Sequence, residues 1–204
     1  MALADLTFKL YTNSTLTTLF SGTLSVTHQS DLSDNPQDFL LYFGSASSGV
    51  KLEATSNPSV DNITLTPTDT LPEWVASTAV ALGYTVEPTV DNTYRYVVTT
   101  AGTTGATEPT WPTTIGSSVT SGTAVFKCVA KSHQPTEIKL ATTSGGLDSA
   151  TGGAALVLGT QILAGTANAV PVHIRVTNAV TTVSSNVGYP EIGLYINNVT
   201  ESAV

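Results

Sequence analysis

The chain has 204 residues, of which 11% are charged, compared with about 25% in an ordinary soluble domain. Seven Lys and Arg residues stand against 15 Asp and Glu residues, which gives a formal net charge of -8 at pH 7. Because so few cations cannot form a basic patch, we expect neither nucleic acid nor an anionic membrane surface as a partner.

Segments in which apolar and polar residues alternate recur along the chain, each bounded by Gly, Pro, Asn, Asp or Ser. A period of two predicts β-strands with one buried and one solvated face, as in antiparallel sheets that pack in pairs. In chain order these segments are 6–10, 24–26, 39–43, 50–54, 63–65, 138–140, 156–158, 170–176 and 192–196. The sequence therefore predicts an all-β protein, an antiparallel β-sandwich of the immunoglobulin-like or jelly-roll-like type.

The best candidate for a helix is the segment 72–82. Pro72 suits a first helical position, Glu73 would favour the positive end of the helix, and Gly83 would terminate it. We therefore expect at most one short helix in a β-rich chain.

The middle of the chain differs in composition from both flanks. From about residue 71 to residue 134 it contains both tryptophans and the single cysteine, Cys128, whereas the flanks are aliphatic. A lone cysteine cannot form an intrachain disulfide, and a module inserted at an exposed loop can leave its host fold intact. We predict a β-sandwich made of residues 1–70 and 135–204, interrupted by a small β-rich module at 71–134.

The N-terminal residues show no basic region followed by an apolar stretch. We therefore expect no secretory signal and no transmembrane segment, and synthesis in a cytoplasm.

The three histidines lie in different segments of the chain, at His28, His133 and His173. His28 lies near Asp31 and Asp34, as a general base with an orienting carboxylate would, but no Gly-X-Ser-X-Gly nucleophile motif stands nearby. The alternating pattern around His173 predicts an exposed strand residue. We expect no catalytic residues and a protein that is not an enzyme.

Asp31, Asp34 and Asp38 loosely resemble a calcium loop, but the turn glycine and the terminal glutamate of such a loop are missing. A solvated loop with Asx turns is the favoured interpretation. The glycine pairs at 145–146 and 152–153 are not followed by the Lys-Ser/Thr of a phosphate loop. We therefore expect no metal and no cofactor.

The central segment carries an ordered aromatic pattern. It reads Trp74, Gly83-Tyr84-Thr85-Val86-Glu87-Pro88, Tyr94-Arg95-Tyr96-Val97-Val98, Ala101-Gly102-Thr103-Thr104-Gly105, Glu108-Pro109-Thr110-Trp111-Pro112 and Gly122-Thr123-Ala124-Val125-Phe126-Lys127-Cys128-Val129. This order resembles a small module found in virion proteins of tailed bacteriophages. It is similar, more distantly, to small chitin-binding-type carbohydrate modules, although Tyr84 stands where those modules usually have a polar residue.

The flanks, with the segments 20–27, 39–45, 138–142, 156–159, 169–176 and 192–196, resemble small sandwich domains of phage head and tail surface proteins. The resemblance implies a non-enzymatic structural protein on the virion surface, made in the cytoplasm of a bacterial host. A capsid decoration or cement protein is the first expectation, with the major capsid protein or other virion proteins as partners and with self-association into homo-oligomers. The apolar tails at 1–6 and 199–204 would dock on a neighbour as extra strands.

An adhesion protein of the tail or the head fibres is the alternative, with a module that binds host-surface glycans. Exposed aromatic rings stack on the C–H face of a pyranose, and Trp74, Tyr94, Tyr96 and Trp111 are the available rings. Trp74, Tyr94, Trp111 and Phe126 are also the obvious core of so small a module, whereas Tyr96 and Tyr84 are less constrained. The adhesion hypothesis requires that Trp111 or Tyr96 is exposed to solvent.

A glycan hydrolase is the third hypothesis, and it requires two carboxyl groups that face each other in a cleft. Glu73, Glu87 and Glu108 are the glutamates that the module offers for such a pair.

Overall fold

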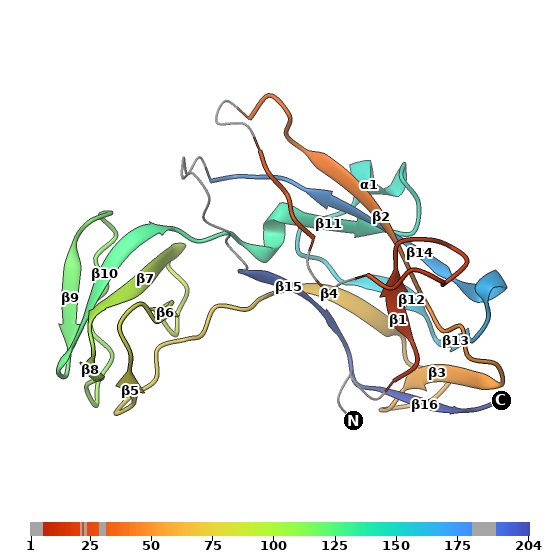
Figure 1. Cartoon of the computed structure of the whole chain (residues 1–204), viewed down its shortest axis with the longest axis horizontal. Helices are drawn as coiled ribbons and strands as arrows, with labels where there is room; N and C mark the ends of the chain where they lie inside the picture. Colours follow the sequence, from red (N-terminus) through yellow and green to blue (C-terminus); the bar gives the residue numbers. More distant parts are fainter. Residues whose placement is uncertain (1–5, 21, 23, 29–31, 181–190) are drawn as a thin grey trace. The chain divides into compact units, whose positions relative to one another are not determined.

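The computed structural model describes residues 6–20, 22, 24–28, 32–180 and 191–204 (Figure 1). Strands account for 43% of the structure and helices for 5%, so the protein is all-β, as the sequence predicts. Among the described residues, no helix is long and apolar enough to span a membrane.

The chain forms two compact units. The first contains the described residues up to Thr68 together with Pro135–Asn178 and Gly193–Val204. The second contains Asp69–Gln134 and, among the described residues that follow Asn178, Ala179, Val180, Glu191 and Ile192. The module predicted from the sequence, 71–134, includes none of the residues that follow Asn178.

One antiparallel sheet of the first unit has four strands in the order β1-β2-β14-β11. The strands are β1 (Lys9–Tyr11), β2 (Gln37–Gly44), β11 (Ile138–Ala141) and β14 (Val170–Val176). Leu41 and Phe43 of β2 are buried, as are Val172 and Ile174 of the neighbouring β14. The alternating pattern therefore correctly identified the face of this sheet that packs on the core.

The other layer of this unit consists of two three-stranded sheets, β13-β3-β16 and β12-β4-β15. Their strands are β3 (Val50–Ala54), β4 (Ile63–Asp69), β12 (Leu156–Gly159), β13 (Gln161–Leu163), β15 (Ile192–Ile196) and β16 (Val199–Ala203). Three pairs of consecutive strands, β3 and β4, β12 and β13, and β15 and β16, each supply one strand to each sheet. A loop at residues 55–62 connects β3 with β4. The layer supplies the buried side chains Leu52, Ala54, Ile63, Leu65, Leu158, Ile162 and Ile196. Two layers around an apolar core are consistent with the predicted β-sandwich.

The helical content of this unit is confined to single turns. Helix α1 spans Gly146–Ser149, and 3-10 turns span Pro135–Glu137 and Thr166–Asn168.

The second unit contains a four-stranded antiparallel sheet, β6-β7-β10-β9, and a two-stranded sheet, β5-β8. The strands are β5 (Ala79–Val80), β6 (Thr85–Val86), β7 (Tyr94–Thr100), β8 (Gly102–Thr103), β9 (Ser118–Ser121) and β10 (Ala124–Lys131). Long strands β7 and β10 form its centre (Figure 1). The buried cluster on this unit consists of Trp74, Val86, Tyr96, Val98, Ala124, Phe126 and Cys128.

Three expectations about local structure are wrong. Residues 24–28 are not in a strand, although Leu24 and Val26 alternate with polar residues. The segment 72–82 is not helical, because Ser77 has a φ of 51° and the next residues form β5 against β8. The C-terminal segment is not free to dock on a neighbour as an extra strand, since β16 pairs with β3 of its own chain.

A buried carboxylate joins distant segments of the second unit. Glu191 is 1% exposed, and its Oε1 lies 2.6 Å from Nη1 of Arg95 on β7. The backbone N–H of His133 donates to Glu191 Oε2 at 2.5 Å, and the N–H of Thr70 donates to the Glu191 carbonyl at 2.9 Å. Because a charge buried without its partner is costly, this arrangement stabilises the unit only while both ions are present.

We predict that Glu191→Gln lowers the free energy of unfolding by about 3–5 kcal/mol, because it removes one charge of a buried ion pair. Chemical denaturation monitored by tryptophan fluorescence measures the change, since both tryptophans lie in the second unit. Asp148→Asn is a control, because Asp148 lies 2.7 Å from Arg175 but its side chain is 75% exposed. That exposed pair is expected to contribute less than about 1 kcal/mol. Equal losses in the two variants would contradict the prediction.

Candidate functional site

The four aromatic residues named from the sequence separate into two classes. Trp74 is 7% exposed and Tyr96 is 0% exposed, and both belong to the buried cluster of the second unit. Tyr94 and Trp111 are partly buried and pack against that cluster. Trp74 and Tyr96 therefore have the core role, and neither ring is available to stack on a ligand.

The position of Tyr96 corrects the expectation that it is among the less constrained aromatic residues. Its hydroxyl donates to the carbonyl of Pro112 at 2.9 Å and accepts from Nδ2 of Asn92 at 2.8 Å. Both bonds are satisfied inside the unit, which is how a tyrosine can be fully buried without leaving its hydroxyl unpaired.

Trp111 is held in place on three sides. Its ring centroid lies 4.4 Å from that of Tyr96, with 46° between the planes, and 5.3 Å from that of Phe126 in an edge-on arrangement. Its indole N–H donates to Glu108 Oε1 at 2.8 Å. These contacts fix the ring, so a ligand that met its remaining surface would not have to order it.

An open hollow of about 450 Å³ lies beside Trp111. Two loops line it, and we call it the Trp111 hollow; its residues are Pro88, Val90, Asn92, Glu108, Pro109, Thr110, Trp111 and Thr113. Val90 is 82% exposed. The sequence singles out Trp111 as a candidate ring and Glu108 as a candidate carboxylate, whereas Pro88, Val90 and the threonines carry no chemical signal of their own.

Glu108 supplies the negative charge of the Trp111 hollow. Its Oε1 accepts from the indole of Trp111 and from the backbone N–H of Thr89, the latter at 2.9 Å. Its Oε2 accepts from the Thr89 hydroxyl. Partial burial raises the pKa of this carboxyl, but the bonds from Thr89 and Trp111 outweigh it and hold the pKa below its usual value. Glu108 is therefore ionised at neutral pH.

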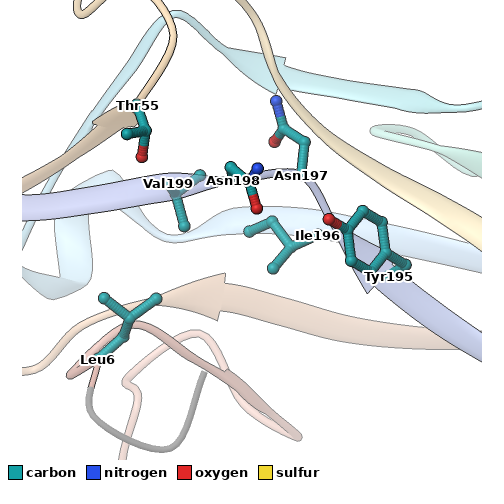
Figure 2. Close-up of a pocket in the computed structure, with 7 residues that line it drawn as sticks. All are labelled: Leu6, Thr55, Tyr195, Ile196, Asn197, Asn198 and Val199. Atoms are coloured by element: carbon teal, nitrogen blue, oxygen red, sulfur yellow. The ribbon is translucent and has the colours of Figure 1, made fainter. Parts of the chain in front are cut away.

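A second hollow, of about 350 Å³, lies in the first unit and was not anticipated from the sequence. Figure 2 shows its lining, which is Leu6, Thr55, Tyr195, Ile196, Asn197, Asn198 and Val199. The Asn197 side chain accepts from the backbone N–H of Thr64 at 2.9 Å and donates to the Asn62 carbonyl at 2.8 Å. Because the Trp111 hollow contains one of the aromatic rings predicted from the sequence together with an ionised carboxylate, we regard it as the better candidate for a binding site.

The predicted polar cluster near His28 is only partly brought together. Nδ1 of His28 lies 3.7 Å from Oδ1 of Asp34, whereas Asp31 lies outside the described residues. Asp38 is on β2, where both of its oxygens accept from Arg175 at 2.7 Å. In the part of the chain that the structure describes, no group of three or more His, Cys, Asp or Glu side chains is arranged to hold a metal ion.

The three glutamates of the hydrolase hypothesis have different surroundings. Glu108 lines the Trp111 hollow, Glu73 is exposed, and Glu87 is buried at 6% exposure. Glu73 and Glu87 form an isolated backbone bridge, and the Glu87 N–H donates to the Pro72 carbonyl at 3.0 Å. Only one of the three glutamates lines either of the two hollows described here.

Comparison of the chain with models of known protein families, with curated proteins and with solved structures finds no match.

Glu87 gives the second unit a dependence on pH. Burial, followed by the negative charges of Asp69 and Asp91 and an interaction with Glu73, raises the pKa of this carboxyl from 4.5 to about 8. Between these two values the folded protein holds a proton that the unfolded chain releases. The contribution of Glu87 to stability is therefore fully present below pH 4.5 and is lost as the pH rises toward 8.

We predict that Glu87→Gln, which is neutral at every pH, leaves the thermal unfolding temperature nearly unchanged at pH 5 and raises it relative to the native protein at pH 9. Thermal denaturation at pH 5, 7 and 9 measures the difference. Glu73→Gln serves as the control, because Glu73 is exposed and its removal should produce a smaller change with pH. A shift of the same size at pH 5 and pH 9 would argue against the assignment.

Proposed function

We propose that the protein is a non-enzymatic structural protein on the outside of a tailed-bacteriophage virion, where it decorates or cements the capsid. One observation carries the proposal: the residues that resemble the virion module are those that build the second unit. Trp74, Tyr96 and Phe126 of that pattern share one buried cluster. The large aromatic residues of that pattern therefore belong to the core that determines the fold of the unit.

The surface chemistry supports the same role. The exposed positions of β7 and β9 are threonine and serine, at Thr99, Thr100, Ser118 and Thr120. Such hydroxyl-bearing strands can donate and accept hydrogen bonds with modest desolvation. Several of the few charges are also paired within the chain, as Arg175 is with Asp38 and Asp148. Because only 11% of the residues are charged, neighbouring copies on a shell would meet mainly through uncharged groups.

The expected partners are the major capsid protein and further copies of this chain. Quantitative mass spectrometry of purified virions tests this directly. We expect the protein at a copy number in a fixed ratio to the major capsid protein, as the capsid lattice requires. A few copies per particle would place it at the neck or the tail, contrary to decoration, and its absence from virions would overturn the proposal.

We propose as a second candidate that the small unit is an adhesion module that binds glycans. The Trp111 hollow is the observation that favours it, since it combines a fixed aromatic ring with polar groups from Asn92, Glu108 and Thr110. Sugar sites use this combination, in which apolar C–H faces meet the ring and hydroxyls meet the polar groups.

We predict that Val90→Glu lowers the affinity of the full chain for glycans by at least about tenfold, because it places a bulky charge at the Trp111 hollow. Glycan-array binding followed by titration calorimetry measures the loss. Leu82→Glu is the matched control, since Leu82 is 70% exposed in the same unit but does not line the hollow. The second candidate fails if the native chain binds no glycan, and also if the two variants bind alike.

A further inference from the structure

We infer that the Trp111 hollow selects uncharged oligosaccharides and discriminates against anionic ones that carry uronate or sialate groups. The inference rests on the second candidate function and adds to it the charge of the ligand. It follows from how charges are distributed around the hollow and from the capacity of Glu108 Oε2 to accept a further hydrogen bond.

Glu108 is the one ionisable side chain among the residues that line the Trp111 hollow. Lys, Arg and His are absent from that lining, so nothing within it would pair with a carboxylate of the ligand. Asp91, which lies in the sequence between the lining residues Val90 and Asn92, is an exposed acidic residue and introduces no positive charge there.

None of the arginine and lysine residues of the second unit lines the hollow. Arg95 is committed to the buried Glu191 carboxylate. Lys127 and Lys131 are on β10 and are not part of the lining of the hollow. An anionic ligand would therefore enter a hollow of its own sign, on a chain whose net charge is -8.

Uncharged sugars meet complementary groups in the same place. Val90, Pro109 and Trp111 offer apolar surface for the C–H faces of a pyranose ring. The Glu108 carboxylate can accept a further hydrogen bond at Oε2, where the Thr89 hydroxyl is its present donor. Hydroxyl groups of a sugar are donors, and a bond to an ionised acceptor is stronger than one between neutral groups.

The size of the discrimination follows from the repulsion between the Glu108 carboxylate and one carboxylate of the ligand. At a separation of about 5 Å near a protein surface, such a pair weakens binding by about tenfold or more at low salt. The effect should shrink as ionic strength rises, because exposed charges are screened.

Titration calorimetry of the full chain tests the inference with tetrasaccharides of glucose, of N-acetylglucosamine and of galacturonate. At low salt, we expect at least one neutral tetrasaccharide to bind and tetragalacturonate to bind at least about tenfold more weakly than it. Added salt should reduce this ratio.

Glu108→Gln is the decisive variant, because glutamine retains an oxygen that can accept from the Trp111 indole and from the Thr89 N–H while its charge is removed. We expect the ratio between neutral and anionic ligands to fall by about tenfold in this variant. Glu73→Gln removes an equal charge from an exposed position outside the lining and should leave the ratio unchanged. Thermal unfolding of each variant verifies that the fold is intact.

The outcomes separate the inference from the function on which it rests. Binding of tetragalacturonate as tight as that of the neutral ligands would overturn the selectivity and leave glycan binding standing. A ratio that Glu108→Gln does not change would also overturn it. If none of the three saccharides binds, both the inference and the second candidate function fail.

Discussion

The buried carboxylate of Glu191 is the constraint on which the second unit depends. Its two oxygens and its carbonyl receive bonds from Arg95, His133 and Thr70, which lie near the middle, the end and the beginning of the segment 69–134. Glu191 thus connects the beginning of this segment, at Thr70, with its end, at His133. Because Glu191 belongs to a later part of the chain, the unit is not a simple continuous insertion.

The aromatic cluster of this unit connects its stability with its candidate site. Tyr96 and Phe126 lie in the core and contact Trp111, which reaches the hollow. Trp111, the ring that would meet a ligand, is therefore oriented by two buried side chains that cannot reach the ligand. This division explains why four aromatic residues of similar appearance in the sequence have different roles, and why substituting Trp111 would disturb the core together with the site.

Much of the β-structure could be predicted, because alternation reports which residues are buried. It identified the segments that became β2, β3 and β14, whose inner faces form a sandwich core. It failed at 24–26, since alternation does not reveal whether a partner strand exists. The pairing of Arg95 with Glu191 could not be predicted either, because it joins residues far apart in the sequence. For the same reason, the aromatic pattern could not tell that Tyr96 is buried and Trp111 reaches a hollow.

The loop at residues 55–62 is a position at which the chain can accept an insertion. The loop connects β3 with β4, and each of these strands has a partner strand on both edges. Neither strand therefore depends on the loop to stay in its sheet. Val60, near its tip, is 64% exposed. Lengthening a surface loop costs little entropy once its ends are fixed. A foreign peptide placed at this point would be presented in every copy of the protein, and the sandwich could serve as a carrier for it.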